Sequence, residues 1–362
     1  MKLTFPNMGN MSILLGALMR ELGLDFVPPG ETGDSTAALG VKYAPSGACM
    51  PMKIILGGFI EANRLGADTG IFFGGKGPCC FGYFAESFNL IFRNNNIPMK
   101  ILTLEKDFGT VKQVLTLLKN ESSFRPSQAP YIISTALKCA EELDRLEDEM
   151  LAVRASLCRK QAQREFESYR RRARSELKGA SGLGALLTQI QKCFLKLSHF
   201  EKDFEPYIKI ALVGDIYTLL DPFINKDIRY TLACRGVLTQ CSVTLYGWLC
   251  EKLKRTPAPW NMYADKYMPY HIGGFARQSL GYAAASAARG ADGIIEIYPM
   301  NCMPEIAAKG ILPAVGRDFS VPILTLVLDE MSASEGYNTR IEAFTDMIER
   351  KRKINEKLLS RC

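Results

Sequence analysis

The sequence predicts an α/β protein with two Rossmann-like or flavodoxin-like parallel-sheet domains and a helical insertion between them. Three observations support this prediction. The chain has 362 residues, which is too long for one ordinary core. Strand-like apolar runs alternate with helix-like stretches in both halves, whereas the middle is mostly helical in pattern. Similar turns, Gly66-Ala67-Asp68 and Gly290-Ala291-Asp292, precede a strand-like run in each half, which favours duplication of one α/β unit.

Residues 1–109 are predicted to form the N-terminal α/β domain. Apolar residues at helical spacing predict a helix over Met11–Leu22, and a second helix is expected over Met52–Leu65. The loop Gly74–Cys80 contains too many Gly and Pro residues to continue a strand. The expected strands of this domain are Lys2–Phe5, Asp25–Val27, Gly70–Phe73 and Met99–Leu104.

Residues 110–205 are predicted to be a mainly helical insertion, and residues 206–362 the C-terminal α/β domain. The insertion contains a charged amphipathic stretch, Glu141–Lys178, followed by a break at Gly179–Gly184. The C-terminal domain opens with Ile208–Gly214, a continuous apolar run typical of a buried parallel strand. It continues with a turn at Asp221–Asn225, a helix through Ala283–Ala288, and strands at Gly293–Ile297 and Ile323–Leu328.

The tripeptide Cys-Met-Pro occurs twice, at Cys49–Pro51 and Cys302–Pro304. About 0.02 copies are expected by chance for this length and composition, so chance does not account for the pair. In both copies Pro suits the first turn of a helix, and Cys precedes that turn. A thiol there meets the positive end of the helix dipole, which favours the thiolate that binds metals or attacks electrophiles. The motif predicts chemistry at two sulfurs that folding brings together.

Eleven cysteines in a chain expected to be cytoplasmic indicate metal or redox use for some of them, not a disulfide framework. With only two histidines, a metal site has to depend on sulfur. Cys79 and Cys302 each follow a predicted strand, and ligands collect at the carboxyl ends of parallel strands. Four other cysteines are expected to be core residues on helical stretches: Cys139, Cys158, Cys193 and Cys250.

Charge and hydropathy limit the partners of the chain. No run of eighteen or more apolar residues occurs and the N-terminus lacks a signal-peptide pattern, so we expect a cytoplasmic protein without a membrane partner. The net charge of +7 is mild, and much of it comes from Arg170–Arg174 and Arg350–Lys353 on predicted helices. It can steer a nucleotide or coenzyme A, but we expect no nucleic acid partner. Because the sequence has no G-x-x-x-x-G-K-[ST] motif, energy from ATP would have to arrive through another protein.

Three or four thiolates donated singly by distant loops indicate an iron–sulfur cluster held between the domains. A structural zinc site usually has close Cys-x-x-Cys pairs, and this chain has none. Glycines around the cysteines leave backbone amides available to the sulfurs of a cluster. Of the vicinal pair, we favour Cys79 as the ligand and Cys80 as its neighbour, because adjacent residues rarely direct both side chains to one small site.

Several stretches together resemble the 2-hydroxyacyl-CoA dehydratase superfamily, most closely its branch of acyl-CoA dehydratase activase-related proteins. The resemblance covers both α/β halves, and the helical middle carries none of it. The stretches are Cys49–Lys53, Gly77–Tyr83, Asp221–Asn225, Pro299–Glu305, and Asp329–Glu330 with Thr339–Phe344.

The resemblance implies a [4Fe-4S] or larger cluster on Cys49, Cys79 and Cys302. It also implies an oxygen-sensitive, anaerobic system in which a separate ATP-hydrolysing activator supplies low-potential single electrons. These electrons would serve radical dehydration of a coenzyme A thioester or reduction of another small molecule, so the chain would be a dehydratase-like lyase, an iron–sulfur reductase or an electron-transfer protein. Where the family usually has Gly-Pro-Cys-Arg, this chain has Cys80 in place of Arg, which offers a fourth ligand that would close the open iron position.

Two other functions remain as alternatives. In the first, the chain is a non-catalytic iron–sulfur scaffold, with the helical insertion as the surface that binds a homologous subunit or a second copy. In the second, it is a zinc-stabilised α/β module that binds an anionic small molecule. No catalytic residue is assigned. Glu305 is a candidate base or a complement to the helix dipole, and Lys53 a candidate partner of a thioester phosphate or a reduced cluster.

Overall fold

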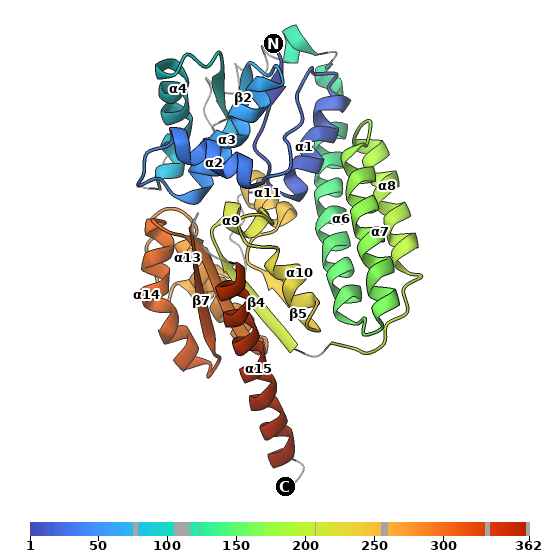
Figure 1. The fold of residues 1–362 in the computed structure, drawn as a ribbon, viewed down its shortest axis with the longest axis vertical. Helices are drawn as coiled ribbons and strands as arrows, with labels where there is room; N and C mark the ends of the chain where they lie inside the picture. The colour runs from blue at the N-terminus through green and yellow to red at the C-terminus, as the bar shows by residue number, and fades with distance from the viewer. Residues whose placement is uncertain are drawn as a thin grey trace. The chain divides into compact units, whose positions relative to one another are not determined.

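The computed structural model describes residues 1–74, 79–104, 116, 118–122, 124–206, 208–254, 260–329 and 334–359 (Figure 1). It divides into two compact units. Unit 1 comprises residues 1–150, 160–201 and 245–253, and unit 2 comprises residues 151–159, 202–244 and 254–362. Each unit contains one parallel sheet, which confirms the predicted mixed α/β class with two parallel-sheet domains. The predicted domain bounds stay predictions.

Unit 1 is built on a three-stranded parallel sheet in the order β1-β2-β3. Its strands are β1 (Leu3–Thr4), β2 (Thr69–Phe73) and β3 (Lys100–Leu104), close to the predicted runs. The predicted strand at Asp25–Val27 is wrong: it is only a single bridge from Phe26 to Leu3, because β1, its neighbour, is two residues long.

Helices cover both faces of this sheet. On one face, α1 packs its apolar side over a buried cluster that includes Leu3 and Ile71. On the other face, Phe59 of α3 and Phe88 of α4 meet edge to face, and Phe88 meets Phe72 of β2 in the same way. The helices are α1 (Asn10–Glu21), α2 (Asp34–Tyr43), α3 (Met50–Arg64), the 3-10 helix η1 (Cys80–Tyr83) and α4 (Phe84–Asn94).

The helices α2 and α3 pack at unusually short range. A Cβ atom on Gly40 would lie 1.9 Å from the carbonyl oxygen of Lys53, and one on Gly57 would lie 2.0 Å from that of Thr36. The two glycines therefore allow the helix backbones to touch. The sequence pattern did not predict α2, because only Thr36 and Gly40 of this helix are buried and no apolar stripe marks it.

The predicted helical insertion forms a bundle of three long helices, α6, α7 and α8, which lie side by side in green in Figure 1. The expected break at Gly179–Gly184 is confirmed, because α7 ends at Lys178 and α8 begins at Leu183. A second break at residues 156–159 was not expected. The elements are η2 (Pro126–Gln128), α6 (Ala129–Ala155), α7 (Lys160–Lys178) and α8 (Leu183–Leu197).

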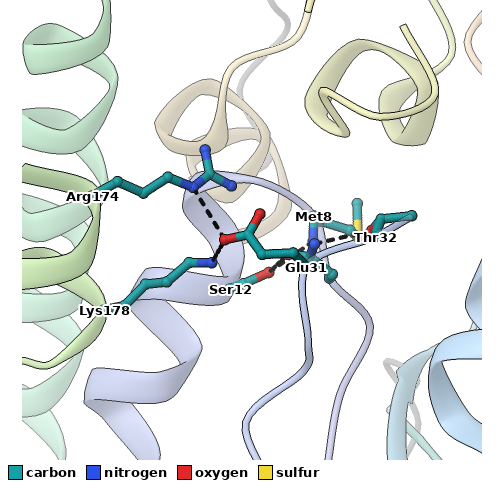
Figure 2. Close-up of polar contacts among 7 residues, drawn as sticks. Met8, Ser12, Glu31, Thr32, Arg174 and Lys178 are labelled. Atoms are coloured by element: carbon teal, nitrogen blue, oxygen red, sulfur yellow. Dashed lines mark hydrogen bonds and ion pairs between the residues drawn. The ribbon is translucent and has the colours of Figure 1, made fainter. Parts of the chain in front are cut away.

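The segment that leads into α2 is tied to α1 and α7. Asn7, just before α1, donates from Nδ2 to Oγ1 of Thr32 at 3.0 Å. Glu31 pairs with Lys178 and with Arg174, whose Nε lies 3.6 Å away (Figure 2). Burial raises the pKa of Glu31. The hydrogen bond from Lys178 and the charge of Arg174 together lower this pKa by a larger amount, so the net shift is downward. Arg174, part of the predicted basic run, thus forms an ion pair within the chain.

Unit 2 is built on a four-stranded parallel sheet in the order β5-β4-β6-β7. Three of its strands match predicted runs, whereas β5 was not predicted. The strands are β4 (Ile208–Gly214), β5 (Val237–Cys241), β6 (Gly293–Pro299) and β7 (Ile323–Leu328). The order places β4 and β6 at the centre, where Val213 pairs with Glu296 and Glu296 with Thr325.

Helices again cover both faces. On one face, α13 and α14 pack over Ala211, Val213 and Ile294 in a buried cluster. On the opposite face, Phe344 and Ile348 of α15 lie against Gly293. The helices of unit 2 are α9 (Ile216–Leu220), α10 (Ile228–Ala233), α12 (Asn261–Ala264), α13 (Ala276–Ala288), α14 (Met303–Asp318) and α15 (Ser334–Leu359), whereas α11 (Leu245–Lys254) falls almost entirely in unit 1.

Within the described residues, every helix is too short or too polar to cross a membrane.

Candidate functional site at the helix-capping cysteines

Cys49 is the N-cap residue of α3, and Pro51 lies in the first turn of that helix. The backbone of Cys49 is extended, and its carbonyl oxygen accepts hydrogen bonds from the amides of Met52 at 3.0 Å and Lys53 at 3.4 Å. Its side chain is half-buried. The predicted position of this cysteine, directly before a helix with proline in the first turn, is confirmed.

Cys302 is the N-cap residue of α14 and is likewise followed by proline in the first turn. The strand β6 ends at Pro299, and Asn301, with φ 68°, turns the chain towards the helix. The amide of Cys302 donates to Pro299 at 3.1 Å, and its carbonyl oxygen accepts from Ile306 at 2.9 Å. The second Cys-Met-Pro copy therefore has the same local structure as the first, and it follows a strand as predicted.

Cys79 caps the short helix η1, and Cys80 is the first residue of that helix. Residues 75–78 of the predicted Gly-rich loop lie outside the described residues. The side chain of Cys79 is half-buried, whereas that of Cys80 is exposed. The two neighbours thus differ in environment, and which of them is a ligand stays a prediction.

In unit 1, topology places Cys49 at the carboxyl end of the sheet. The helix α3 ends at Arg64, and Gly66, with φ 96°, turns the chain straight into β2. Phe59, near the end of α3, lies against Gly70 near the start of β2, so α3 runs back along the strand. Its N-terminus is therefore at the carboxyl end of β2, the end from which the chain continues to Cys79.

In unit 2, the first turns of α13 and α14 lie side by side at the carboxyl end of the sheet. Oγ of Ser279, in the first turn of α13, donates to Oε2 of Glu305 in the first turn of α14 at 2.9 Å. Gly274, just before α13, packs on Pro304: a Cβ atom there would lie 2.7 Å from the ring. These contacts fix the turn that Cys302 caps.

The two Cys-Met-Pro helices carry different ionisable side chains next to the cysteine, a lysine in α3 and a glutamate in α14. One turn after Cys49, Lys53 is 4% exposed, and its Nζ donates to the carbonyl oxygen of Ser46 at 3.3 Å. One turn after Cys302, Glu305 is fully buried. Burial raises the pKa of Glu305 well above its usual range, and the nearby carboxylates Asp215 and Glu296 raise it further. The first site therefore has a buried lysine, and the second has a buried carboxyl group whose pKa is raised.

Asp215 and Glu296 were not among the predicted site residues. Asp215 caps α9 directly after β4, and its Oδ1 accepts from the amides of Tyr217 and Thr218, each at 3.1 Å. Glu296 lies within β6, and its Oε2 accepts from Oγ1 of Thr325 at 2.8 Å. Desolvation by burial raises the pKa of Asp215 to about 6 and that of Glu296 to about 7. A glutamate inside the apolar run Gly293–Pro299 was the sequence signal that could have identified this cluster.

The remaining predictions about cysteines have mixed outcomes. Cys139 and Cys193 are fully buried in the helical bundle, as expected, and burial raises the pKa of the Cys139 thiol to about 12. Cys250 is half-buried on α11. The expectation for Cys158 is wrong: it is exposed, because α6 ends at Ala155 and Cys158 lies in the turn before α7.

Cys49 and Cys79 belong to unit 1 and Cys302 to unit 2, so their meeting at one cofactor stays a prediction. Across the described ranges, no three His, Cys, Asp or Glu side chains gather in a way that could hold a metal ion. Comparisons of the sequence with models of known protein families and with curated proteins find no match. A proposal about the function therefore has to depend on the family resemblance of the sequence and on the positions of the cysteines at helix N-termini.

Proposed function

We propose that this chain is an iron–sulfur protein of the 2-hydroxyacyl-CoA dehydratase type, with Cys49, Cys79 and Cys302 as cluster ligands. The observation that supports this most is that Cys49 and Cys302 are the N-cap residues of the long helices α3 and α14, while Cys79 precedes the short 3-10 helix η1. Thiolates are the ligands of iron–sulfur clusters, and the amides of a first helical turn stabilise negative charge beside them. The sequence predicts a position before a helix for Cys49 and Cys302, and for Cys79 a place directly after a strand.

The donor set fits such a cluster in chemistry and number. Three thiolates would leave one iron of a [4Fe-4S] cluster open to substrate, and the exposed Cys80 is the residue that would close it. The proposal requires the sulfurs of Cys49, Cys79 and Cys302 to reach a common cluster. When bound, the cluster would supply one-electron chemistry at low potential.

The residues beside the cysteines would tune this site. The ammonium group of Lys53, one turn after Cys49, offsets the negative charge of nearby thiolates because opposite charges attract strongly where water is excluded. We propose that electrons come from a separate ATP-hydrolysing activator, since the sequence has no phosphate-binding loop of the P-loop type. A coenzyme A thioester or another small reducible molecule would be the substrate.

The first experiment is purification of the full chain under anaerobic conditions, followed by iron, sulfide and zinc analysis. We expect brown protein with about four irons per chain. The single variants Cys49→Ser, Cys79→Ser and Cys302→Ser should each lose most of the iron. Cys158→Ser is the matched control, because that thiol is also accessible but lies in the turn before α7. Colourless protein with one zinc per chain would contradict the proposal and favour the zinc-stabilised binding module.

A second experiment separates a reducible cluster from a purely structural one. Dithionite should produce a one-electron paramagnetic signal in the iron-loaded protein. Cys80→Ser should keep both the iron and the signal if Cys80 is not a ligand. Full iron loading without any reduction would instead indicate the non-catalytic scaffold.

A further inference from the structure

Three carboxyl groups in the interior of unit 2 each keep one oxygen without a hydrogen-bond partner. The oxygens are Oδ2 of Asp215, Oε1 of Glu296 and Oε1 of Glu305, and all three are shielded from solvent. Glu296 and Glu305 are 0% exposed as whole residues. An unbonded carboxylate oxygen in such a place is costly unless a proton or another ligand neutralises it.

The three groups lie on one face of the sheet. Glu296 shares the face of β6 with Ile294, which is covered by α13 and α14. Glu305 enters from the first turn of α14, and Asp215 follows the carboxyl end of β4, the strand paired with β6. Glu305 interacts electrostatically with both Asp215 and Glu296, so the three carboxyl groups form one coupled set.

The donors that reach this set are neutral. They are the hydroxyl groups of Ser279 and Thr325 and the two amides at the start of α9. Among the described residues, Lys309 of α14 acts on the set: its charge lowers the pKa of Glu296, but its side chain is exposed. Tyr298 of β6 also faces Glu296 and Lys309, and burial raises the pKa of this phenol, which therefore stays neutral. Three ionised carboxylates are not compensated by these partners.

We propose that Asp215, Glu296 and Glu305 form a proton-binding site beneath the N-terminal turn of α14, with Glu305 as the group that keeps its proton at neutral pH. The ligand is one or more protons, each held on one of three carboxyl groups that interact electrostatically. A bound metal cation is the competing occupant, but no three metal-binding side chains converge within the described residues. The site itself is independent of the proposed function.

Infrared spectroscopy of the full chain, prepared without iron, tests the proposal at pH 7. A protonated carboxyl group absorbs as a C=O stretch that shifts in D2O, well separated from carboxylate bands. The wild-type protein should show this band, and Glu305→Gln should remove the largest part of it. Glu335→Gln is the matched control: Glu335 is also in the first turn of a helix of unit 2, but it is exposed. It should leave the band unchanged.

Stability as a function of pH gives a second readout that needs no band assignment. The folded pKa values are above the unfolded ones, so the folded chain binds more protons and its stability falls as pH rises from about 4 through about 7. For each retained proton, the folding equilibrium constant should fall up to about tenfold per pH unit. Glu296→Gln should flatten this loss, and it also serves if Glu305→Gln does not fold.

Several outcomes overturn the proposal. One is a wild-type protein at pH 7 without the carboxylic C=O band. Another is a band that Glu305→Gln and Glu296→Gln both leave intact, and a third is stability that rises with added calcium or potassium chloride far more than with choline chloride. None of these outcomes affects the iron analysis of the cysteine variants, so this inference and the proposed function fail separately.

Discussion

The turns into β2 and β6 are built alike, although they lie in different units. A helix ends, a glycine with φ 96° at Gly66 or 85° at Gly290 reverses the chain, and an aspartate follows. The amide of Asp68 donates to Lys2 at 3.0 Å, and that of Asp292 donates to Lys209 at 2.8 Å. Each aspartate carboxylate also accepts from the amide of the same lysine, at 3.1 Å in unit 1 and 2.9 Å in unit 2.

The two Cys-Met-Pro copies do not follow this correspondence. Cys49 caps the helix that precedes β2, whereas Cys302 caps the helix that follows β6. The residue of unit 1 that follows the corresponding strand and caps the next helix is Cys79. The comparison shows that the strand connections repeat between the units, while the tripeptide marks two helices in different topological places. Duplication explains the turns better than it explains the tripeptide.

The largest expected effect concerns the packing of α3 against α2 in unit 1, where the two helix backbones approach closely. Gly57→Ala should lower the free energy of unfolding by about 3 kcal/mol, because the new Cβ would meet the backbone of α2. The adjacent Gly58→Ala is the control, since its Cβ would lie 4.0 Å from the nearest side-chain atom. It should be neutral or stabilising by up to about 1 kcal/mol. Denaturant titration followed by circular dichroism measures both, and equal effects would refute the close packing.

In unit 2, the position of the first turn of α14, which follows Cys302, depends on one glycine in the loop before α13. Gly274→Ala should cost about 2 kcal/mol, because φ is +55° and the new Cβ would press on Pro304. Thermal unfolding of the variant checks this value. Gly310→Ala, inside α14 with nothing within 4 Å, should not destabilise the protein. A harmless Gly274→Ala would show that the first turn of α14 is held in some other way.

The correspondence between the two aspartates predicts similar losses. Asp68→Ala and Asp292→Ala should each cost about 1–2 kcal/mol at neutral pH, since each leaves a backbone amide without its side-chain acceptor. Burial raises the pKa of Asp68, but the hydrogen bonds from Thr69 and Lys2 together lower it by a larger amount, so the net shift is downward. Its contribution is therefore present above pH 4 and is lost as pH falls through the lowered pKa. Chemical denaturation at pH 7 and pH 3 measures this, with Asp346→Ala as an exposed control; a large difference between the two aspartates would break the correspondence.

The smallest effect is expected at the ion pairs that hold the segment before α2. Glu31→Gln should lower the free energy of unfolding by about 0.5 kcal/mol, because the Glu31 side chain in the pairs with Arg174 and Lys178 is largely exposed. The loss should shrink at high salt, which screens such pairs. Denaturation curves at low and high salt test this, and a loss independent of salt would assign Glu31 a packing role instead.

Local sequence was sufficient where structure depends on neighbours along the chain. The strands Ile208–Gly214 and Ile323–Leu328 lie where apolar runs predicted them, and both Cys-Met-Pro cysteines cap helices because proline in the first turn acts locally. The helix α2 was not predicted because it packs on α3 through close backbone contacts at glycines and carries no apolar stripe. Cys158 was misplaced because the end of α6 was not recognised.

The sequence by itself determined the α/β class, the positions of most strands, and the placing of Cys49 and Cys302 at helix N-termini, because each follows from periodicity or from turn chemistry within a few residues. Only the tertiary structure decided that Asp215, Glu296 and Glu305 interact electrostatically in the interior of unit 2. Glu296 and Glu305 come from the consecutive elements β6 and α14, whereas Asp215 comes from the start of α9, much earlier in the chain. Their burial, and with it the rise in their pKa values, exists only when α13 and α14 cover the sheet, since desolvation is a property of the packed interior.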